Sequence, residues 1–121
     1  MKKEHFEYLV FQAIKNLPLE FQDQLENIEI VLEDRPNRQQ LTEDGFSPRG
    51  ILLGLYEGVP LTKRGAHYGL VSPDKITIFQ KAIESICGND SEVKREVERV
   101  VRHEIAHYFG LDDDRLDELG L

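Results

Sequence analysis

The sequence predicts an α+β fold in which a small mixed sheet packs against an N-terminal helix and a helix near the C-terminal end. Apolar residues recur at helical spacing at both ends of the chain, and β-branched runs occupy the middle. With 121 residues, the chain is long enough to bury a core of its own. We therefore expect a single domain that spans residues 1–121.

The first half of the chain predicts a helix, a strand and a long loop. The helix is indicated by apolar side chains at helical spacing, and Pro18 marks its end. Residues Ile28–Glu33 are β-branched and roughly alternating, as in a strand. Residues 34–50 are polar and contain prolines and glycines, so we expect a long loop there. The helical stripe consists of Phe6, Leu9, Val10, Ala13, Ile14 and Leu17.

The second half predicts two more strands and two helices. Residues 51–56 and 75–79 are the strands, and Tyr68–Val71 is a candidate for a further short one. A brief helix follows over residues 81–87, and Asn89 with Glu92 resembles a capping box that begins a long helix. That helix should end at Gly110, with a last turn or two over residues 112–119. Its buried stripe is Val93, Val97, Val100, Val101 and Ile105.

Charge, hydropathy and cysteine content indicate which partners and which cellular compartment the chain is suited to. The net charge of −8 argues against nucleic acid and against an anionic membrane. No apolar run approaches the roughly 18 residues of a membrane span, and the N-terminus lacks the apolar stretch of a signal peptide. Cys87 has no second cysteine to pair with, and its apolar neighbours predict a buried core thiol. We therefore expect a cytoplasmic protein.

The long helix carries a zinc-hydrolase signature, HExxHxxGxxD. His103 and His107 stand four residues apart, so a helix directs both imidazoles to one point. Glu104 projects beside that point, where a general base for a metal-bound water belongs. Gly110 can end the helix and let Asp113 return as a third ligand. Three protein ligands with an open fourth position are typical of a catalytic zinc site.

Two features of this motif leave alternatives open. HExxH alone also occurs on ordinary amphipathic helices, and the added glycine and carboxylate favour the metal site. Some zinc peptidases take the third ligand from a glutamate on a later helix, but only fourteen residues follow His107, which favours the short-range ligand. Asp112 and Asp114 flank Asp113 and could replace it. A carboxylate ligand is harder than imidazole, so manganese and iron remain alternatives to zinc.

Several segments resemble the minimal zincins, a family of small bacterial zincin-like proteins related to metzincin metallopeptidases. Residues 103–120, HEIAHYFGLDDDRLDELG, resemble the C-terminal signature of that family. Residues 54–62 are similar to its GLYEGVPL segment, and residues 75–79 resemble its I-x-I-F strand. The resemblance runs from about residue 28 to the C-terminus. It implies a zincin-like fold, a metal held by His103, His107 and Asp113, and Glu104 as the catalytic carboxylate. It implies no particular substrate.

The chain departs from full-sized metzincins after the motif. Its only methionine is Met1, so the Met-containing turn beneath the metal and the tyrosine from that turn are both missing. If the site hydrolyses an amide, Glu104 would take a proton from the attacking water, and a further donor would hold the oxyanion. The candidate donors are Tyr56, Arg64, His67 and Tyr68.

Three functions fit the sequence. The first is a zinc-dependent peptidase acting on a peptide or protein substrate, which the intact Glu104 favours. The second is a metal-binding domain without hydrolytic activity that acts in regulation or partner binding, which the short C-terminus favours. The third is a structural acidic domain with a vestigial motif. The first two predict a bound metal, whereas the third does not.

Overall fold

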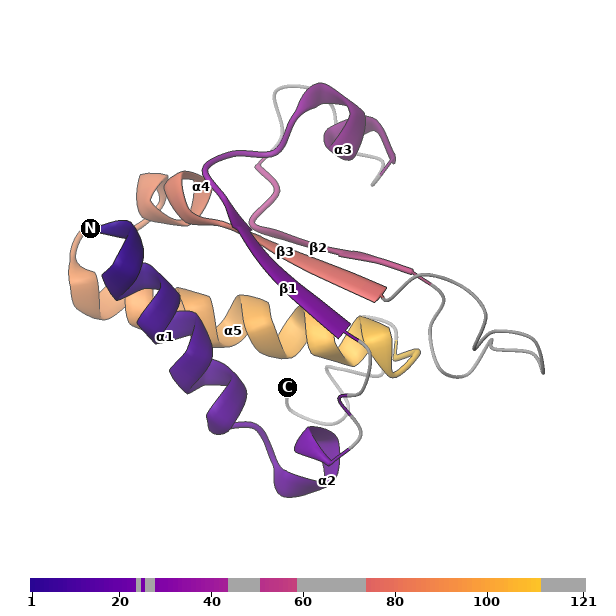
Figure 1. Ribbon diagram of the computed structural model, residues 1–121. Helices are drawn as coiled ribbons and strands as arrows, with labels where there is room; N and C mark the ends of the chain where they lie inside the picture. The colour runs from indigo at the N-terminus through magenta and orange to yellow at the C-terminus, as the bar shows by residue number, and fades with distance from the viewer. Residues whose placement is uncertain (24, 26–27, 44–50, 59–73, 112–121) are drawn as a thin grey trace.

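The computed structural model describes residues 1–23, 25, 28–43, 51–58 and 74–111 (Figure 1). Within these ranges the chain forms a three-stranded sheet and a set of helices, which confirms the α+β fold. In chain order the elements are α1 (Lys3–Lys15), α2 (Leu19–Gln22), β1 (Ile28–Glu33), α3 (Arg38–Glu43), β2 (Gly54–Glu57), β3 (Asp74–Phe79), α4 (Gln80–Ser85) and α5 (Asp90–Tyr108).

The sheet is mixed, as the sequence predicts, and its strand order is β1-β3-β2. β3 lies in the centre and pairs in parallel with β1, so that Ile76 stands opposite Ile30. On its other side β3 pairs antiparallel with β2, and Ile76 stands opposite Tyr56. Because a parallel pair cannot be closed by a tight turn, the chain passes through α3 and β2 before it returns beside β1.

The main core lies between one face of the sheet and the helices α1 and α5. Side chains alternate between the faces of a strand, so Ile76 and Ile78 of β3 point to the same side. They pack against Phe6 of α1 and Val97 of α5, and each of these four residues is at most 1% exposed. A second apolar cluster lies apart from this core and joins β2 and β3 to α3 and α4; it contains Leu41, Leu52, Leu55, Phe79 and Ala82.

Capping interactions define where α5 begins. Asn89 precedes the helix in an extended conformation, and its side chain accepts a hydrogen bond from the Glu92 N–H at 2.9 Å. The Glu92 carboxylate accepts in turn from the Gly88 N–H rather than from Asn89 itself. The predicted cap is therefore present, with its reciprocal bond shifted by one residue. The helix after it runs for nineteen residues to the candidate site.

Three features of the structure differ from the sequence predictions. The predicted loop over residues 34–50 contains α3, which a capping box begins: Asn37 Oδ1 accepts from the Gln40 N–H at 2.8 Å, and Gln40 Oε1 accepts from the Asn37 N–H at 2.8 Å. The short helix α2 follows Pro18, where no helix was predicted. The second strand begins at Gly54 rather than at residue 51. The predictions for residues 68–71 and 112–119 lie outside the described residues.

Two further expectations concern membrane-spanning helices and the thiol of Cys87. No helix in the described part of the chain is long and apolar enough to cross a membrane. Cys87 packs at the margin of the main core and is half-buried rather than buried. Burial raises the pKa of its thiol, and the nearby charges of Glu96 and Glu92 raise it further. A raised pKa keeps the thiol protonated and a poor nucleophile at neutral pH.

Candidate metal centre

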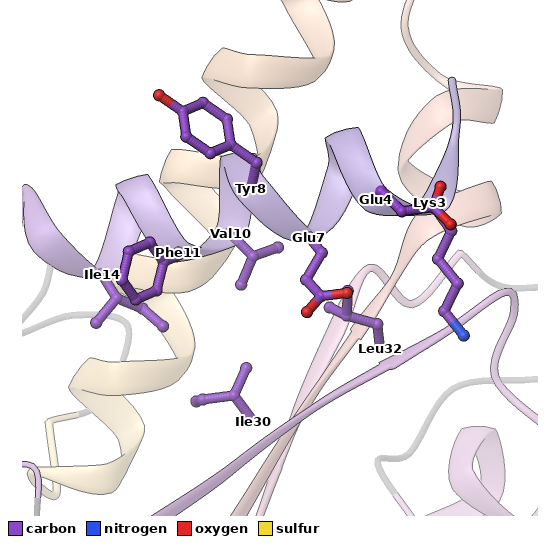
Figure 2. Close-up of a pocket in the computed structure, with 9 residues that line it drawn as sticks. All are labelled: Lys3, Glu4, Glu7, Tyr8, Val10, Phe11, Ile14, Ile30 and Leu32. Carbon is purple, nitrogen blue, oxygen red and sulfur yellow. The ribbon is translucent and has the colours of Figure 1, made fainter.

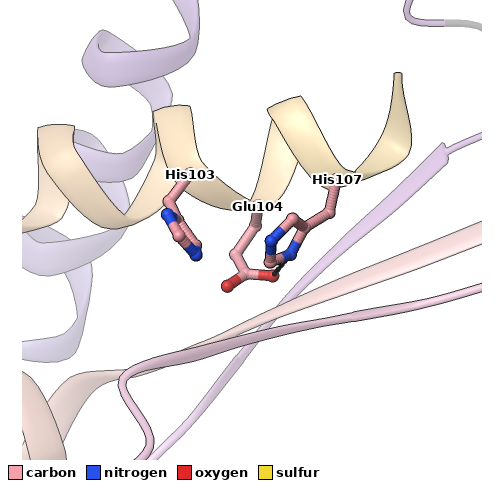
Figure 3. A group of neighbouring side chains, drawn as sticks. All are labelled: His103, Glu104 and His107. Carbon is pink, nitrogen blue, oxygen red and sulfur yellow. Dashed lines mark ion pairs between the residues drawn. The ribbon is translucent and has the colours of Figure 1, made fainter. Parts of the chain in front are cut away.

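The last two turns of α5 bring together the three polar residues of the motif (Figure 3). His103 and His107 lie on one face of the helix, and their ring centroids are 4.5 Å apart with an interplanar angle of 70°. Both side chains are half-buried, so each has a solvent-accessible part. A helix gives this arrangement without any help from a loop, because residues four apart lie one above the other.

Glu104 projects from the same helix beside the two histidines (Figure 3). It is only 6% exposed, which is unusual for a carboxylate. Its Oε2 atom is 3.4 Å from Nδ1 of His107, a distance that makes an ion pair if the imidazole is protonated (Figure 3). The imidazole of His107 is therefore a polar neighbour of the buried Glu104 carboxylate.

The donor set of these three residues fits a divalent transition metal. One ligand atom from each of His103, Glu104 and His107 can be chosen such that all lie within 4.8 Å of one another. Nitrogen ligands stand about 2.0–2.1 Å from zinc, so donors around a common ion are at most about 4.2 Å apart. Small side-chain movements would bring the donor atoms from 4.8 Å to the separation that a shared zinc ion requires. Imidazole and carboxylate ligands together suit zinc and neighbouring first-row metals.

A tight turn ends the motif helix. Gly110 has φ 83°, a left-handed conformation that only glycine adopts at little cost. Its N–H donates to the His107 carbonyl at 2.9 Å, and the Leu111 N–H donates to the Ala106 carbonyl at 3.0 Å. This pair of bonds is a Schellman motif, which satisfies carbonyls at the helix end and redirects the chain. The prediction for Gly110 is confirmed.

A hydrogen-bonded polar pair lies beside the end of the motif helix. The Tyr56 hydroxyl on β2 donates a hydrogen bond to Oδ2 of Asp74 at 2.7 Å, and Asp74 is 1% exposed. The Tyr56 ring also meets the ring of Tyr108 edge-on at 6.1 Å. No role for Asp74 was predicted from the sequence. Its position at the start of a β-branched strand could have indicated a carboxylate held at the edge of the core. Tyr56 was one of four candidate oxyanion donors predicted from the sequence, and in the structure its hydroxyl donates to the Asp74 carboxylate.

The other residues named from the sequence fall outside the described part of the chain. Asp113 lies there, as do its neighbours Asp112 and Asp114. The candidate donors Arg64, His67 and Tyr68 also lie outside the described residues. The structure thus assembles His103, Glu104 and His107, and the third metal ligand stays a prediction.

A groove of about 730 Å³ lies elsewhere, between α1 and β1 (Figure 2). Its apolar lining includes Phe11 and Ile14 of α1 and Ile30 and Leu32 of β1. Among the described residues that line it, the polar ones come from α1 and include no histidine, and none belongs to α5. The groove is therefore separate from the motif side chains.

Comparison with known proteins places this geometry in a family. The family model described as "zincin-like metallopeptidase" matches residues 25–121. The chain belongs to the zincin-like metallopeptidase family. Membership implies a divalent metal, usually zinc, and the His103, Glu104 and His107 cluster is where the described residues offer donors for it.

A solved structure supports the fold of this zincin-like chain. It is a conserved hypothetical protein from Thermus thermophilus, with 20% sequence identity and a TM-score of 0.57. The match covers 98% of this chain and 97% of the other. At this identity the likeness shows the fold alone. A search of curated proteins finds no match.

Proposed function

We propose that this chain is a zinc-dependent metallopeptidase that hydrolyses peptide bonds. In this proposal His103, His107 and Asp113 hold the metal, and Glu104 is the general base. The observation that carries it is the placement of a buried carboxylate within 3.4 Å of one of two neighbouring imidazoles, on the helix that bears the family motif. Manganese or iron would serve the same ligand set.

The proposed chemistry assigns one task to each side chain. Zinc, when bound, supplies Lewis acidity that polarises a peptide carbonyl and acidifies water. Glu104 accepts a proton from the water whose oxygen attacks the carbonyl carbon. It then delivers that proton to the amide nitrogen as the carbon–nitrogen bond breaks. The second water proton, left on the new carboxyl group, passes to the amine, so the products are a carboxylate and an ammonium ion. Because Glu104 is 6% exposed, few competing waters surround it.

A binding module without hydrolysis is the second candidate. One observation favours it: the Glu104 carboxylate belongs to the same cluster of donor atoms as the two imidazoles. If Glu104 ligates the metal, the carboxylate cannot also accept a proton freely, and the site loses its base. The protein would then hold a metal for regulation or for contact with a partner.

Glu104→Gln separates the two candidates. The amide keeps the shape of the side chain but cannot accept a proton. For a peptidase we expect zinc affinity close to that of the wild type and loss of cleavage of a broad peptide library. For a binding module with Glu104 as a ligand, zinc affinity itself should fall by at least about tenfold.

Glu98→Gln is the matched control, because Glu98 lies on the same helix and is not part of the donor cluster. It should leave both zinc affinity and cleavage unchanged. A chelator should abolish wild-type cleavage, and added zinc should restore it. Equal product yields from wild type and Glu104→Gln would contradict the proposed peptidase.

A further inference from the structure

Gly54 stands where β2 passes beneath the motif helix. It is buried and pairs with Ile78 in the central strand. Among the described glycines only Gly58 and Gly110 have positive φ, so the backbone of Gly54 has a conformation open to any residue. The absence of a side chain at position 54 therefore needs an explanation in space rather than in backbone freedom.

That explanation lies on α5. A Cβ atom added at Gly54 would stand 2.6 Å from Cγ1 of Val100 and 3.1 Å from Cγ of Glu104. Favourable contacts between carbon atoms begin at about 3.5 Å, so both approaches are too close. Val100 and Glu104 are four residues apart and share one face of the helix. The glycine thus lets the helix face that carries Glu104 lie directly on the strand.

The two neighbours differ in how easily they can move. Val100 is 3% exposed within the main core, and a β-branched side chain in a helix has essentially one rotamer. Glu104 has a longer, unbranched side chain whose rotamer can change. A methyl group at position 54 would therefore displace Glu104, or push this part of α5 off the strand. A change of the Glu104 rotamer would alter the 3.4 Å separation between Oε2 of Glu104 and Nδ1 of His107, whereas a shift of α5 would carry both residues away from β2.

We propose that Gly54 is a positioning residue, and that its missing side chain sets the place of the Glu104 carboxylate beside the histidines. The catalytic consequence rests on the proposed function, whereas the structural consequence does not. A displacement of about 1 Å in a reacting group can lower a rate by about 100-fold. Gly54 would then matter for turnover although it has no side chain that could take part in the reaction.

Crystal structures of the metal-free variants test the positional claim first. In Gly54→Ala we expect the Glu104 carboxylate to move by about 1 Å while the Phe6 and Ile76 side chains of the core stay in place. In Gly54→Ala/Val100→Ala the new methyl can occupy the space of the lost Cγ1, so the carboxylate should return. Glu104 in its original place in Gly54→Ala would overturn the inference.

Cleavage assays test the catalytic consequence. Gly54→Ala should cleave about 100-fold more slowly at a nearly unchanged zinc affinity. The double variant should recover to within about tenfold of Val100→Ala, because the closer of the two clashes is removed. Gly88→Ala is the control, because a Cβ there comes no closer than 3.3 Å to the flexible end of Glu92. Cleavage that simply follows the melting temperature across these variants would overturn the positioning role.

Two remaining outcomes are also decisive. If wild-type protein cleaves nothing, the proposed function fails, and the crystal structures alone decide the role of Gly54. If Gly54→Ala does not fold, the double variant decides. A folded double variant with Glu104 in its original place would support the steric account, and an unfolded one would contradict it.

Discussion

The role assigned to the Tyr56 hydroxyl differs between the sequence and the structure. From the sequence it was a candidate donor to an oxyanion. In the structure it donates to the carboxylate of Asp74, which is almost fully buried. A buried carboxylate needs hydrogen-bond donors, so we assign Tyr56 a stabilising role at the junction of β2 and β3.

Tyr56→Phe tests this assignment. The variant removes a donor from a buried charge, and the free energy of unfolding should fall by about 1–3 kcal/mol in urea titrations. Zinc affinity should stay unchanged, and the cleavage rate should change little. Tyr8→Phe is the matched control, since Tyr8 is 56% exposed. Unchanged stability together with a lost cleavage activity would instead make Tyr56 a substrate-facing donor.

Asp113 is the predicted third ligand, and its neighbours provide internal controls. The Schellman turn at Gly110 redirects the chain three residues before it. Asp113→Ala should weaken zinc binding by at least about tenfold in a competition titration, because one charged ligand of three is lost. Asp112→Ala and Asp114→Ala should each do less. A larger loss in Asp112→Ala would shift the register of the ligand by one residue.

At the scale of elements, α5 was the most predictable part of the chain and α3 the least. The stripe of valines, the Asn89 cap and Gly110 all agree on the bounds of α5, and the structure confirms each. The loop prediction for residues 34–50 relied on prolines and polarity. It overlooked the Asn37 and Gln40 capping box, whose signal is as local as that of Asn89.

The turn after α5 carries its own prediction. Gly110→Ala places a Cβ in the left-handed region, and we expect a loss of about 1–2 kcal/mol in the free energy of unfolding. Zinc affinity should also fall, because the turn precedes the predicted ligand. Gly110→Asn should be milder, since asparagine tolerates this conformation.

Gly88→Ala is the control for this turn, because the described structure gives Gly88 no positive φ. Calorimetry and zinc titration measure the two effects separately. Wild-type stability and zinc affinity in Gly110→Ala would contradict the role assigned to the turn.

At the scale of the whole molecule, sequence patterns predicted most elements and the two helices that cover the sheet, but not the order and pairing of the strands. No local sequence pattern predicts that β1 pairs in parallel with β3, because about forty residues separate the two strands. The register of such a pair is decided by packing between distant segments. The motif residues could be predicted because one helix carries them. The steric role of Gly54 could not, because Val100 and Glu104 meet it only after the chain has folded.

The central claim is that His103, Glu104 and His107 mark a metal centre, and metal content tests it most directly. Protein is purified without added metal and without a metal-affinity tag, and its metals are measured by inductively coupled plasma mass spectrometry. We expect about one divalent ion per chain, chiefly zinc, as for a site with three protein ligands. His103→Ala/His107→Ala should hold none while retaining its helical content. Stoichiometric metal in that double variant would contradict the account, as would a wild-type protein that binds no zinc even when zinc is supplied.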